Sequence, residues 1–245
     1  MFEFLKPKRR RADAEVVAVK TISPHVRRIT LGGQEVAAFL ETDGMDAPGA
    51  WLKVSFPNGH VRAYTIRRID RQAGTLDMEF VLHEHGGVSG PGSAWASQAR
   101  IGERLGIGGP RDARFALPPD ASWVILAGDA TALPAIQSIC QVLPAGVKAE
   151  IYAEVPLPAD QQAIESPAQL EISWLHEQAA PGSALCQALL SKPRPNGDGY
   201  IWAAGESGAV RTLRAHFLQS YAMPPRRISA MGYWKVGHAA HRGGG

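Results

Sequence analysis

The residues best suited to chemistry in this 245-residue sequence lie in one short run, VRAYTIRRID at 61–70. Side chains alternate along the run as they do in a β-strand with two different faces. Arg62 offers a guanidinium for a phosphate, Tyr64 a flat ring that can stack, and Thr65 a hydroxyl that can hydrogen-bond. An exposed strand with a cross-strand tyrosine and solvated arginines is the alternative interpretation.

A glycine-rich turn follows at 85–96, HGGVSGPGSAWA, and runs into a segment that can form a helix. Gly90 and Gly92 let the backbone approach a ligand, and Ser93 can cap the helix or bond an anion. Helix N-termini bind phosphate because their first N–H groups have no partner within the helix. A plain loop with a serine cap is the alternative. Together, an arginine, a stacking tyrosine and a phosphate-binding turn predict a flavin dinucleotide site.

Polar residues also follow two apolar strands in the second half of the chain. Asp129 and Thr131 lie in WVILAGDATALPAI (123–136), and Glu206 lies in IWAAGES (201–207). They can cap the helices that follow, or lie at a cofactor crevice at the carboxyl ends of the strands. Both interpretations stay open for Asp129 and Thr131, whereas capping is favoured for Glu206 because a negative charge suits a helix N-terminus. The motif G-x-G-x-x-G is absent, so no Rossmann fingerprint is predicted.

The elements that must position these residues change character halfway along the chain. Short strands are expected at 15–33 (broken at Ser23-Pro24), 51–57, 61–70, 75–83 and 103–110, a spacing typical of an antiparallel barrel or sandwich. Later strands at 147–155, 169–176, 199–207 and 226–237 alternate with helices at 183–192 and 208–221, after a strand and a helix within 122–143. This alternation indicates βαβ units and a parallel sheet. We place the boundary near Pro118-Pro119, which gives domains 1–117 and 118–245.

Composition limits the classes of protein to which the chain can belong. The hydrophobic fraction of 45% and the charged fraction of 20% are typical of a globular protein. The net charge of +3 is too small to indicate nucleic-acid binding, and no apolar run approaches the roughly 20 residues that span a bilayer. The basic run KPKRRR near the N-terminus is expected to be a solvated arm, or alternatively a weak contact with an anionic surface.

Cysteine and histidine usage argues against disulfide, metal and hydrolase chemistry. Cys140 and Cys186 have no disulfide or metal spacing, and both are expected to be buried thiols. His83 and His85 alone are too few for a metal site, which usually needs three or four ligands. No G-x-S-x-G turn is present. We therefore expect a cytoplasmic protein whose own side chains hold no metal.

The runs RAYTIR, GPGSAWA, WVILAGDATALPAI, IWAAGES and GYWKVG occur in this order. They closely resemble those of the siderophore-interacting protein family, FAD-dependent ferric-siderophore reductases among the wider ferredoxin–NADP reductase-like flavoproteins. The resemblance covers about residues 15 to 242. It implies a six-stranded antiparallel FAD-binding barrel followed by a parallel-sheet α/β domain that binds NAD(P)H.

The resemblance also implies roles for individual residues. Those expected to bind the cofactor are Arg62, Ala63, Tyr64, Thr65, His83, Gly90, Pro91, Gly92, Ser93, Trp95, Asp129 and Thr131, the last two in place of a glycine-rich nicotinamide motif. The nicotinamide side is expected to include Glu206, Tyr233 and Trp234. Lys53, Lys235 and Arg242 match a basic siderophore pocket; the alternative for each lysine is an exposed position on a strand or tail.

The activity that the resemblance implies is electron transfer from NAD(P)H, or from a ferredoxin-like donor, through FAD to a ferric siderophore. The siderophore is expected to be anionic and a catecholate, and the protein is expected to be a monomer without nucleic-acid or stable membrane partners. One alternative is a flavoprotein reductase that acts on a quinone, free flavin or a partner protein. A siderophore-binding module without flavin would leave RAYT and GPGSAWA without a role.

Overall fold

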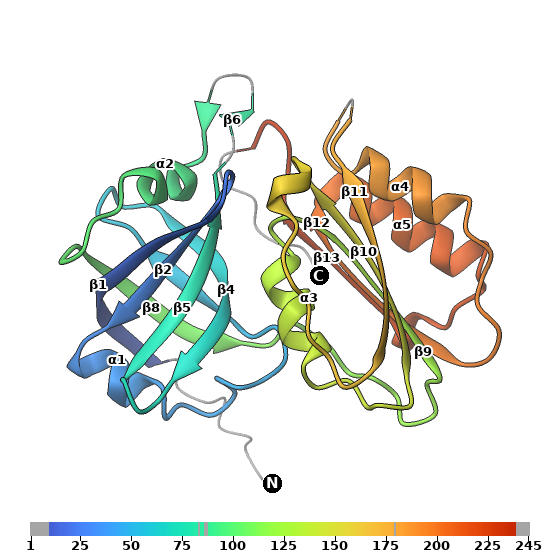
Figure 1. The fold of residues 1–245 in the computed structure, drawn as a ribbon, viewed down its shortest axis with the longest axis horizontal. Helices are drawn as coiled ribbons and strands as arrows, with labels where there is room; N and C mark the ends of the chain where they lie inside the picture. Colours follow the sequence, from blue (N-terminus) through green and yellow to red (C-terminus); the bar gives the residue numbers. More distant parts are fainter. Residues whose placement is uncertain (1–9, 83, 86–87, 179, 239–245) are drawn as a thin grey trace, which may run out of the picture.

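A computed structural model describes residues 10–82, 84–85, 88–178 and 180–238, with 84–85 and 88–89 described as backbone alone (Figure 1). The first half of the chain forms a closed six-stranded antiparallel barrel in the order β1-β2-β5-β4-β3-β8. Its strands are β1 (Arg10–Ser23), β2 (Val26–Gly32), β3 (Trp51–Ser55), β4 (Val61–Asp70), β5 (Thr75–Val81) and β8 (Arg104–Arg111). The predicted barrel is confirmed.

Alternating apolar residues fill the barrel, among them Leu52, Val54, Met78 and Ile107. Helix α2 (Pro91–Gln98) packs against β2 and β5, where the glycine-rich turn predicted it. A short helix, α1 (Gln34–Phe39), was not predicted; it packs against β1 and buries Val36 and Phe39. A two-stranded hairpin, β6 (Glu84–His85) and β7 (Val88–Ser89), was also not predicted.

The second half forms a five-stranded parallel sheet in the order β11-β10-β9-β12-β13, which confirms the predicted α/β domain. Helix α3 lies between the barrel and the sheet, and α4 and α5 cover the opposite face (Figure 1). The strands are β9 (Trp123–Asp129), β10 (Lys148–Val155), β11 (Gln169–His176), β12 (Gly199–Glu206) and β13 (Ile228–Trp234). The helices are α3 (Leu133–Cys140), α4 (Ser183–Leu190) and α5 (Ser207–Gln219), with 3₁₀ turns η1 (Pro158–Asp160) and η2 (Pro225–Arg227).

The order of the strands creates a switch point between β9 and β12. The chain leaves β9 toward β10 on one side and later returns to β12 on the other. Ligands of open α/β sheets bind beyond the carboxyl ends of the strands at such a point. In a Rossmann-type protein, a dinucleotide would be expected to bind at this switch point.

Two sequence-based expectations differ from the structure. Arg10 and Arg11 were predicted to belong to a solvated arm, but they begin β1 and pair with Gly109 and Gly108 of β8. The strand extends to these residues because the alternation of buried Ala12, Ala14 and Val16 with more exposed side chains begins directly after Arg11. Cys140 is buried as predicted, whereas Cys186 is half-buried because it lies at the edge of α4.

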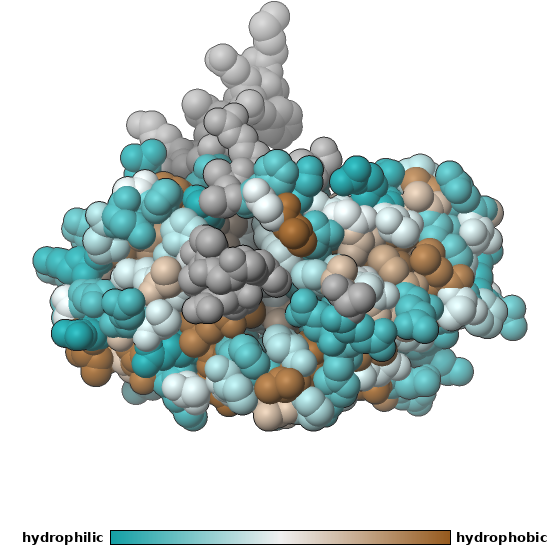
Figure 2. Space-filling view, turned by 90° about the horizontal axis from the view of Figure 1, so that it is seen from above, coloured by the Kyte–Doolittle hydropathy of each residue, from teal (hydrophilic) through white to brown (hydrophobic). Residues whose placement is uncertain are grey.

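The connection between the domains runs from 112 to 122 and contains the predicted boundary. Phe115 and Leu117 already pack against the core of the α/β domain. The surface seen from above in Figure 2 is mostly hydrophilic, with apolar side chains in small separate groups. Within the described residues, no helix is both long and apolar enough to cross a membrane.

Candidate functional site

Strand β4 presents its predicted site residues on two faces. Tyr64 points toward the barrel core, where it packs with the apolar cluster. Thr65 points outward and is buried, because the α/β domain covers it. Its neighbours in β3 follow the same alternation: Trp51 lies opposite Thr65, and Lys53 lies opposite the exposed Ala63.

Tyr64 is held in a cluster of aromatic rings. Its ring centroid lies 4.1 Å from that of Phe80 and 6.0 Å from that of Phe56. Trp95 of α2 packs on the same two rings, and its Nε1 donates to Glu103 Oε2 at 2.9 Å. Burial raises the pKa of Tyr64 although the nearby Arg62 opposes the rise, so the phenol stays neutral. In this arrangement Trp95 joins α2 to the barrel.

The start of α2 fits the hydroxyl of Tyr64 only because residue 92 is glycine. A Cβ on Gly92 would lie 1.8 Å from Tyr64 Oη and 3.3 Å from Phe56 Cζ. The N-cap is Gly90, which has no side chain to cap the helix, and Pro91 follows at the first position. Ser93 is buried within the helix, so the interpretation of Ser93 as N-cap is wrong.

These residues fit the phosphates of a flavin dinucleotide. The backbone of α2 begins beside Tyr64, without a capping side chain from its N-cap residue. The guanidinium of Arg62 is close enough to Tyr64 to lower the pKa of the phenol, and its Nη1 donates to the Val61 carbonyl at 2.8 Å. The structure thus brings a helix start and a guanidinium close to Tyr64, and the binding of a flavin by these groups stays a prediction.

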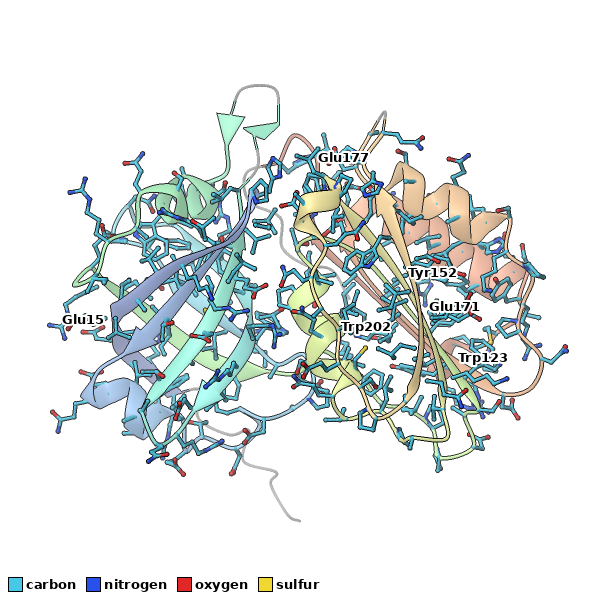
Figure 3. The ribbon with its side chains drawn as sticks, in the orientation of Figure 1. Glu15, Trp123, Tyr152, Glu171, Glu177 and Trp202 are labelled. Carbon is cyan, nitrogen blue, oxygen red and sulfur yellow. The ribbon has the colours of Figure 1, made fainter. Side chains whose placement is uncertain are left out.

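The predicted substrate lysines lie on either side of one interdomain contact. The Tyr233 hydroxyl is buried beside Thr65. Burial raises the pKa of the Tyr233 phenol, and the Thr65 side chain opposes the rise. The Tyr233 ring packs edge-on against Trp202, with centroids 6.4 Å apart. Figure 3 labels Trp202 among the side chains of the α/β domain. Lys53 and Lys235 are both exposed, two residues from Trp51 and Tyr233 respectively. His83 and Arg242 lie outside the described residues.

At the switch point the structure brings together Asp129, Thr131, Glu206 and Trp234. Asp129 Oδ1 accepts from the N–H (2.9 Å) and hydroxyl (2.5 Å) of Thr131. Asp129 Oδ2 accepts from the Glu206 N–H and from Trp234 Nε1, both at 2.8 Å. Burial raises the pKa of Asp129, and these donors oppose the rise. The N-cap residue of α3 is Ala132. Neither Asp129 nor Thr131 is therefore the N-cap, contrary to the capping interpretation.

Glu206 caps helix α5. Its Oε2 accepts from the N–H groups of Gly208 (2.5 Å) and Ala209 (2.9 Å), which confirms the capping interpretation. The carboxylate takes donors that an external anion would otherwise use. The capping contacts do not test the predicted role of Glu206 beside a nicotinamide, which stays a prediction.

A second buried acid, Glu154, was missed by the sequence analysis. It ends β10, and its two oxygens accept from Gly182 N (2.6 Å) and Leu185 N (2.8 Å) at the start of α4. Burial raises its pKa, against these two hydrogen bonds. The acid precedes its helix by nearly thirty residues, so no local spacing in the sequence could have revealed the contact.

Comparisons with known proteins agree with this geometry. Residues 57–114 match the model of the siderophore-interacting FAD-binding domain, and residues 121–237 match that of siderophore-interacting proteins. Ferric vibriobactin reductase ViuB of Vibrio cholerae serotype O1 is 33% identical, over 91% of this chain and 89% of its own length. The crystal structure of a siderophore utilization protein from T. fusca is 32% identical with a TM-score of 0.78, over 94% of each chain.

The fold is also shared with a more distant flavoprotein. The ferredoxin reductase of carbazole 1,9a-dioxygenase has a TM-score of 0.64 at 18% identity, over 92% of this chain and 69% of its own. At that identity the likeness concerns the fold alone. It supports the predicted arrangement of a barrel followed by a parallel α/β domain.

Proposed function

This chain belongs to the siderophore-interacting protein family, and on that premise we propose that it is an FAD-dependent ferric-siderophore reductase. The proposed reaction transfers electrons from NAD(P)H, or from a ferredoxin-like donor, to an Fe(III)-siderophore and releases Fe(II) in the cytoplasm. The observation that supports it most directly is the fit of Gly92 against the Tyr64 hydroxyl beside Arg62.

The barrel residues would hold the flavin through three kinds of contact. The N–H groups at the start of α2 and the Arg62 guanidinium would bind its pyrophosphate. The Tyr64 ring would stack on its ring system. Thr65 leaves the opposite face of β4 and, buried under the α/β domain, would keep water from that face. When bound, the flavin supplies the exchange between a two-electron donor and a one-electron acceptor.

The lysines would attract the substrate. Lys53 and Lys235 are exposed on either side of the Thr65–Tyr233 contact. A ferric catecholate carries negative charge, so these ammonium groups would raise its local concentration over a distance limited by salt screening. The iron is substrate and keeps the oxygen ligands of the siderophore, so the protein needs to supply no ligand of its own. Reduction to Fe(II) weakens the hold of those oxygen donors.

The acceptor is tested most simply under anaerobic conditions. The purified protein is photoreduced and mixed with a ferric triscatecholate, while the flavin absorbance and trapped Fe(II) are followed together. The proposal predicts rapid reoxidation with stoichiometric Fe(II). A flavin that stays reduced would favour the alternative, a reductase with a quinone, free flavin or partner protein as acceptor. A protein that binds no flavin would overturn the cofactor assignment.

The lysines are tested by removing both charges. In the Lys53→Ala/Lys235→Ala variant, we expect the KM for the ferric catecholate to rise about three- to tenfold, since exposed charge contacts contribute about 0.2–1 kcal/mol each. Flavin content should not change, and the effect should shrink at high salt. Lys20→Ala/Lys148→Ala, which removes two exposed lysines elsewhere, is the matched control. Equal KM values in the two double variants would contradict the pocket.

A further inference from the structure

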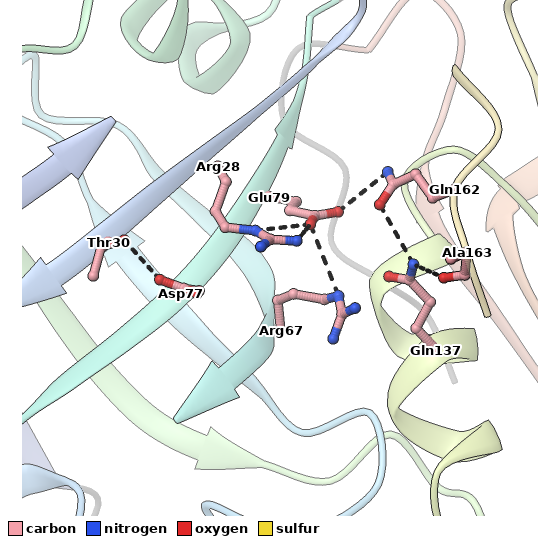
Figure 4. Close-up of polar contacts among 8 residues, drawn as sticks. All are labelled: Arg28, Thr30, Arg67, Asp77, Glu79, Gln137, Gln162 and Ala163. Atoms are coloured by element: carbon pink, nitrogen blue, oxygen red, sulfur yellow. Dashed lines mark hydrogen bonds and ion pairs between the residues drawn. The ribbon is translucent and has the colours of Figure 1, made fainter. Parts of the chain in front are cut away.

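Two guanidinium groups share one carboxylate where the barrel meets the α/β domain (Figure 4). Arg28 donates to Glu79 Oε1 from Nε at 3.1 Å and from Nη2 at 2.5 Å. Arg67 Nε lies 3.8 Å from the same oxygen, too far for a hydrogen bond. The other oxygen of Glu79 accepts from Gln162 Nε2 at 3.4 Å. In this interdomain seam Arg67 Nε is therefore left without a hydrogen bond, although the charges of Glu79, Asp77 and Glu165 all act on its guanidinium.

Two buried polar atoms in the seam make no hydrogen bond to any residue that the structure describes. They are Nε of Arg67 and Oε1 of Gln137. Gln137 lies on α3 and is only 2% exposed. Its Nε2 donates to the Ala163 carbonyl at 3.0 Å and to Gln162 Oε1 at 3.4 Å, which orients the amide. Figure 4 shows the Gln137 oxygen on the side of Arg67.

A third such atom lies close by on the same face of β4. The Tyr233 hydroxyl is buried and near enough to the Thr65 side chain for Thr65 to lower its pKa, but it makes no hydrogen bond of normal geometry to any residue that the structure describes. Although the register of β4 shifts between Ile66 and Arg68, Arg67 approaches Glu79, whose neighbours Met78 and Phe80 point into the barrel core. Arg67 therefore lies on the outer face of the barrel, as Thr65 does. Helix α3 packs against this strand, which brings Gln137 to that face as well.

The hydrogen-bonding types of these three atoms define which groups a bound ligand must offer. A buried donor or acceptor without a partner costs about 1–3 kcal/mol, so a bound group that pairs with them gains that amount. Arg67 needs an acceptor, Gln137 Oε1 needs a donor, and the Tyr233 hydroxyl can serve as either. The pyrimidine edge of a flavin offers two carbonyl oxygens on either side of one N–H. Its pattern of acceptor, donor and acceptor is the complement of this set.

We propose that Arg67, Gln137 and Tyr233 bind the pyrimidine edge of the flavin, so that residues of the α/β domain complete a cofactor site begun by the barrel. The inference rests on the proposed function only in requiring that flavin is bound. It moves Tyr233 from the nicotinamide side to the flavin. The positive charge of Arg67 would also stabilise the negative charge that this edge carries in reduced flavin, and so raise the reduction potential.

The affinity of the apoprotein for FAD tests the contacts one at a time. Arg67→Met removes the charge and donors but keeps the length of the side chain, and Gln137→Leu removes the acceptor at similar volume. We expect the FAD dissociation constant to rise about tenfold or more for Arg67→Met and about fivefold for Gln137→Leu. Gln161→Leu, at the exposed glutamine next to Gln162 in the chain, is the control: its Nε2 lies 3.4 Å from His176 Nε2 rather than in the network around Glu79, so its constant should stay within about twofold of wild type.

The reduction potential gives a readout that general loosening of the seam would not move. By anaerobic equilibration with a reference dye, Arg67→Met and Gln137→Glu should both lower the midpoint potential, because each makes the seam more negative. Gln161→Leu should leave the potential unchanged. If Arg67→Met melts at a markedly lower temperature than wild type, Gln137→Leu and Gln137→Glu alone decide.

Two results would overturn the inference. Unchanged FAD affinity and potential in the Gln137 variants would mean that water alone fills the seam. A change confined to the affinity for NAD(P)H would mean that the carboxamide of a nicotinamide, which also offers an acceptor and a donor, is the group bound there. Either result can occur while wild-type protein still reduces the ferric catecholate, so failure of this inference is distinct from failure of the proposed function.

Discussion

The helices of the two domains begin in different chemical surroundings. In the barrel domain, α2 starts at Gly90, Pro91 and Gly92, without a side-chain cap from its N-cap residue. In the α/β domain, Glu154 accepts from the start of α4 and Glu206 accepts from the start of α5. The start of α2 has no side-chain cap from its N-cap residue, which would suit an external anion, whereas the other domain has filled two helix starts with carboxylates of its own.

The switch point of the sheet continues this difference. Asp129 accepts four hydrogen bonds there, two of which join β9 to Glu206 and to Trp234. The absence of a side chain at Gly205 makes room for the Asp129 carboxylate, because a Cβ on this residue would lie 2.4 Å from Asp129 Oδ2. The parallel sheet thus positions Tyr233 beside Thr65 of the barrel, while the barrel supplies the helix start at which we propose the phosphate site.

The largest effect should follow from adding a side chain at Gly92. Gly92→Val places carbon atoms where the Tyr64 hydroxyl now lies, so the ring must move. Overpacking of this kind costs about 1–3 kcal/mol, so we expect the FAD dissociation constant to rise about tenfold or more. Titration of apoprotein with FAD measures it.

The control for this variant is a glycine with open space around it. No atom lies within 4 Å of a Cβ built on Gly146, so Gly146→Ala should bind FAD as wild type does. Full flavin occupancy in Gly92→Val would contradict the proposal that the start of α2 forms the phosphate site.

An effect on stability, rather than on flavin binding, should follow from removing the Asp129 carboxylate. Asp129→Ala leaves the N–H groups of Thr131 and Glu206 and the Trp234 indole without their acceptor. We expect the free energy of unfolding in urea to fall by about 2–4 kcal/mol, and by about 1 kcal/mol in Trp234→Phe, which removes one donor. A loss of FAD affinity as large as that of Gly92→Val would contradict the separation of roles between the domains.

The smallest effect concerns a contact that joins the two regions. Asp160 of η1 accepts from the Ser23 hydroxyl (2.6 Å) and the His25 N–H (3.0 Å) of the barrel, and its Oδ2 lies 2.8 Å from His25 Nδ1. Burial acts to raise the pKa of Asp160, but these barrel groups lower it by more. A carboxylate with a lowered pKa stabilises the fold above its ordinary pKa, and this contribution is lost as the pH falls through the folded value.

Comparing wild type with Asp160→Asn across pH measures that contribution. The free energy of unfolding should differ by about 1–2 kcal/mol at neutral pH, and the difference should disappear as the pH falls below about 4. A difference that stays constant down to acid pH would mean that the charge of Asp160 is not what joins the domains. The ionised Asp160 carboxylate would then not be the group that links the α/β domain to the barrel.

Local patterns in the sequence predicted the strands of both domains, and the Arg62–Tyr64–Gly92 group, because alternation and glycine spacing act over a few residues. Contacts between distant elements could not be predicted in this way. Glu154 reaches a helix start beyond another strand, Asp129 pairs with Trp234, and Arg67 faces Gln137 only after the domains pack. These contacts depend on burial, because a polar side chain caps a helix, links two strands or is left without a partner only when the surrounding elements have packed.

The most direct test of the account is a crystal structure of the flavin-loaded protein. The account predicts the FAD pyrophosphate at the start of α2, within hydrogen-bond distance of the Gly92 or Ser93 N–H groups and beside Arg62, with Glu154 and Glu206 still capping α4 and α5. A pyrophosphate bound at the carboxyl edge of the parallel sheet, with Asp129 or Glu206 displaced, would contradict it.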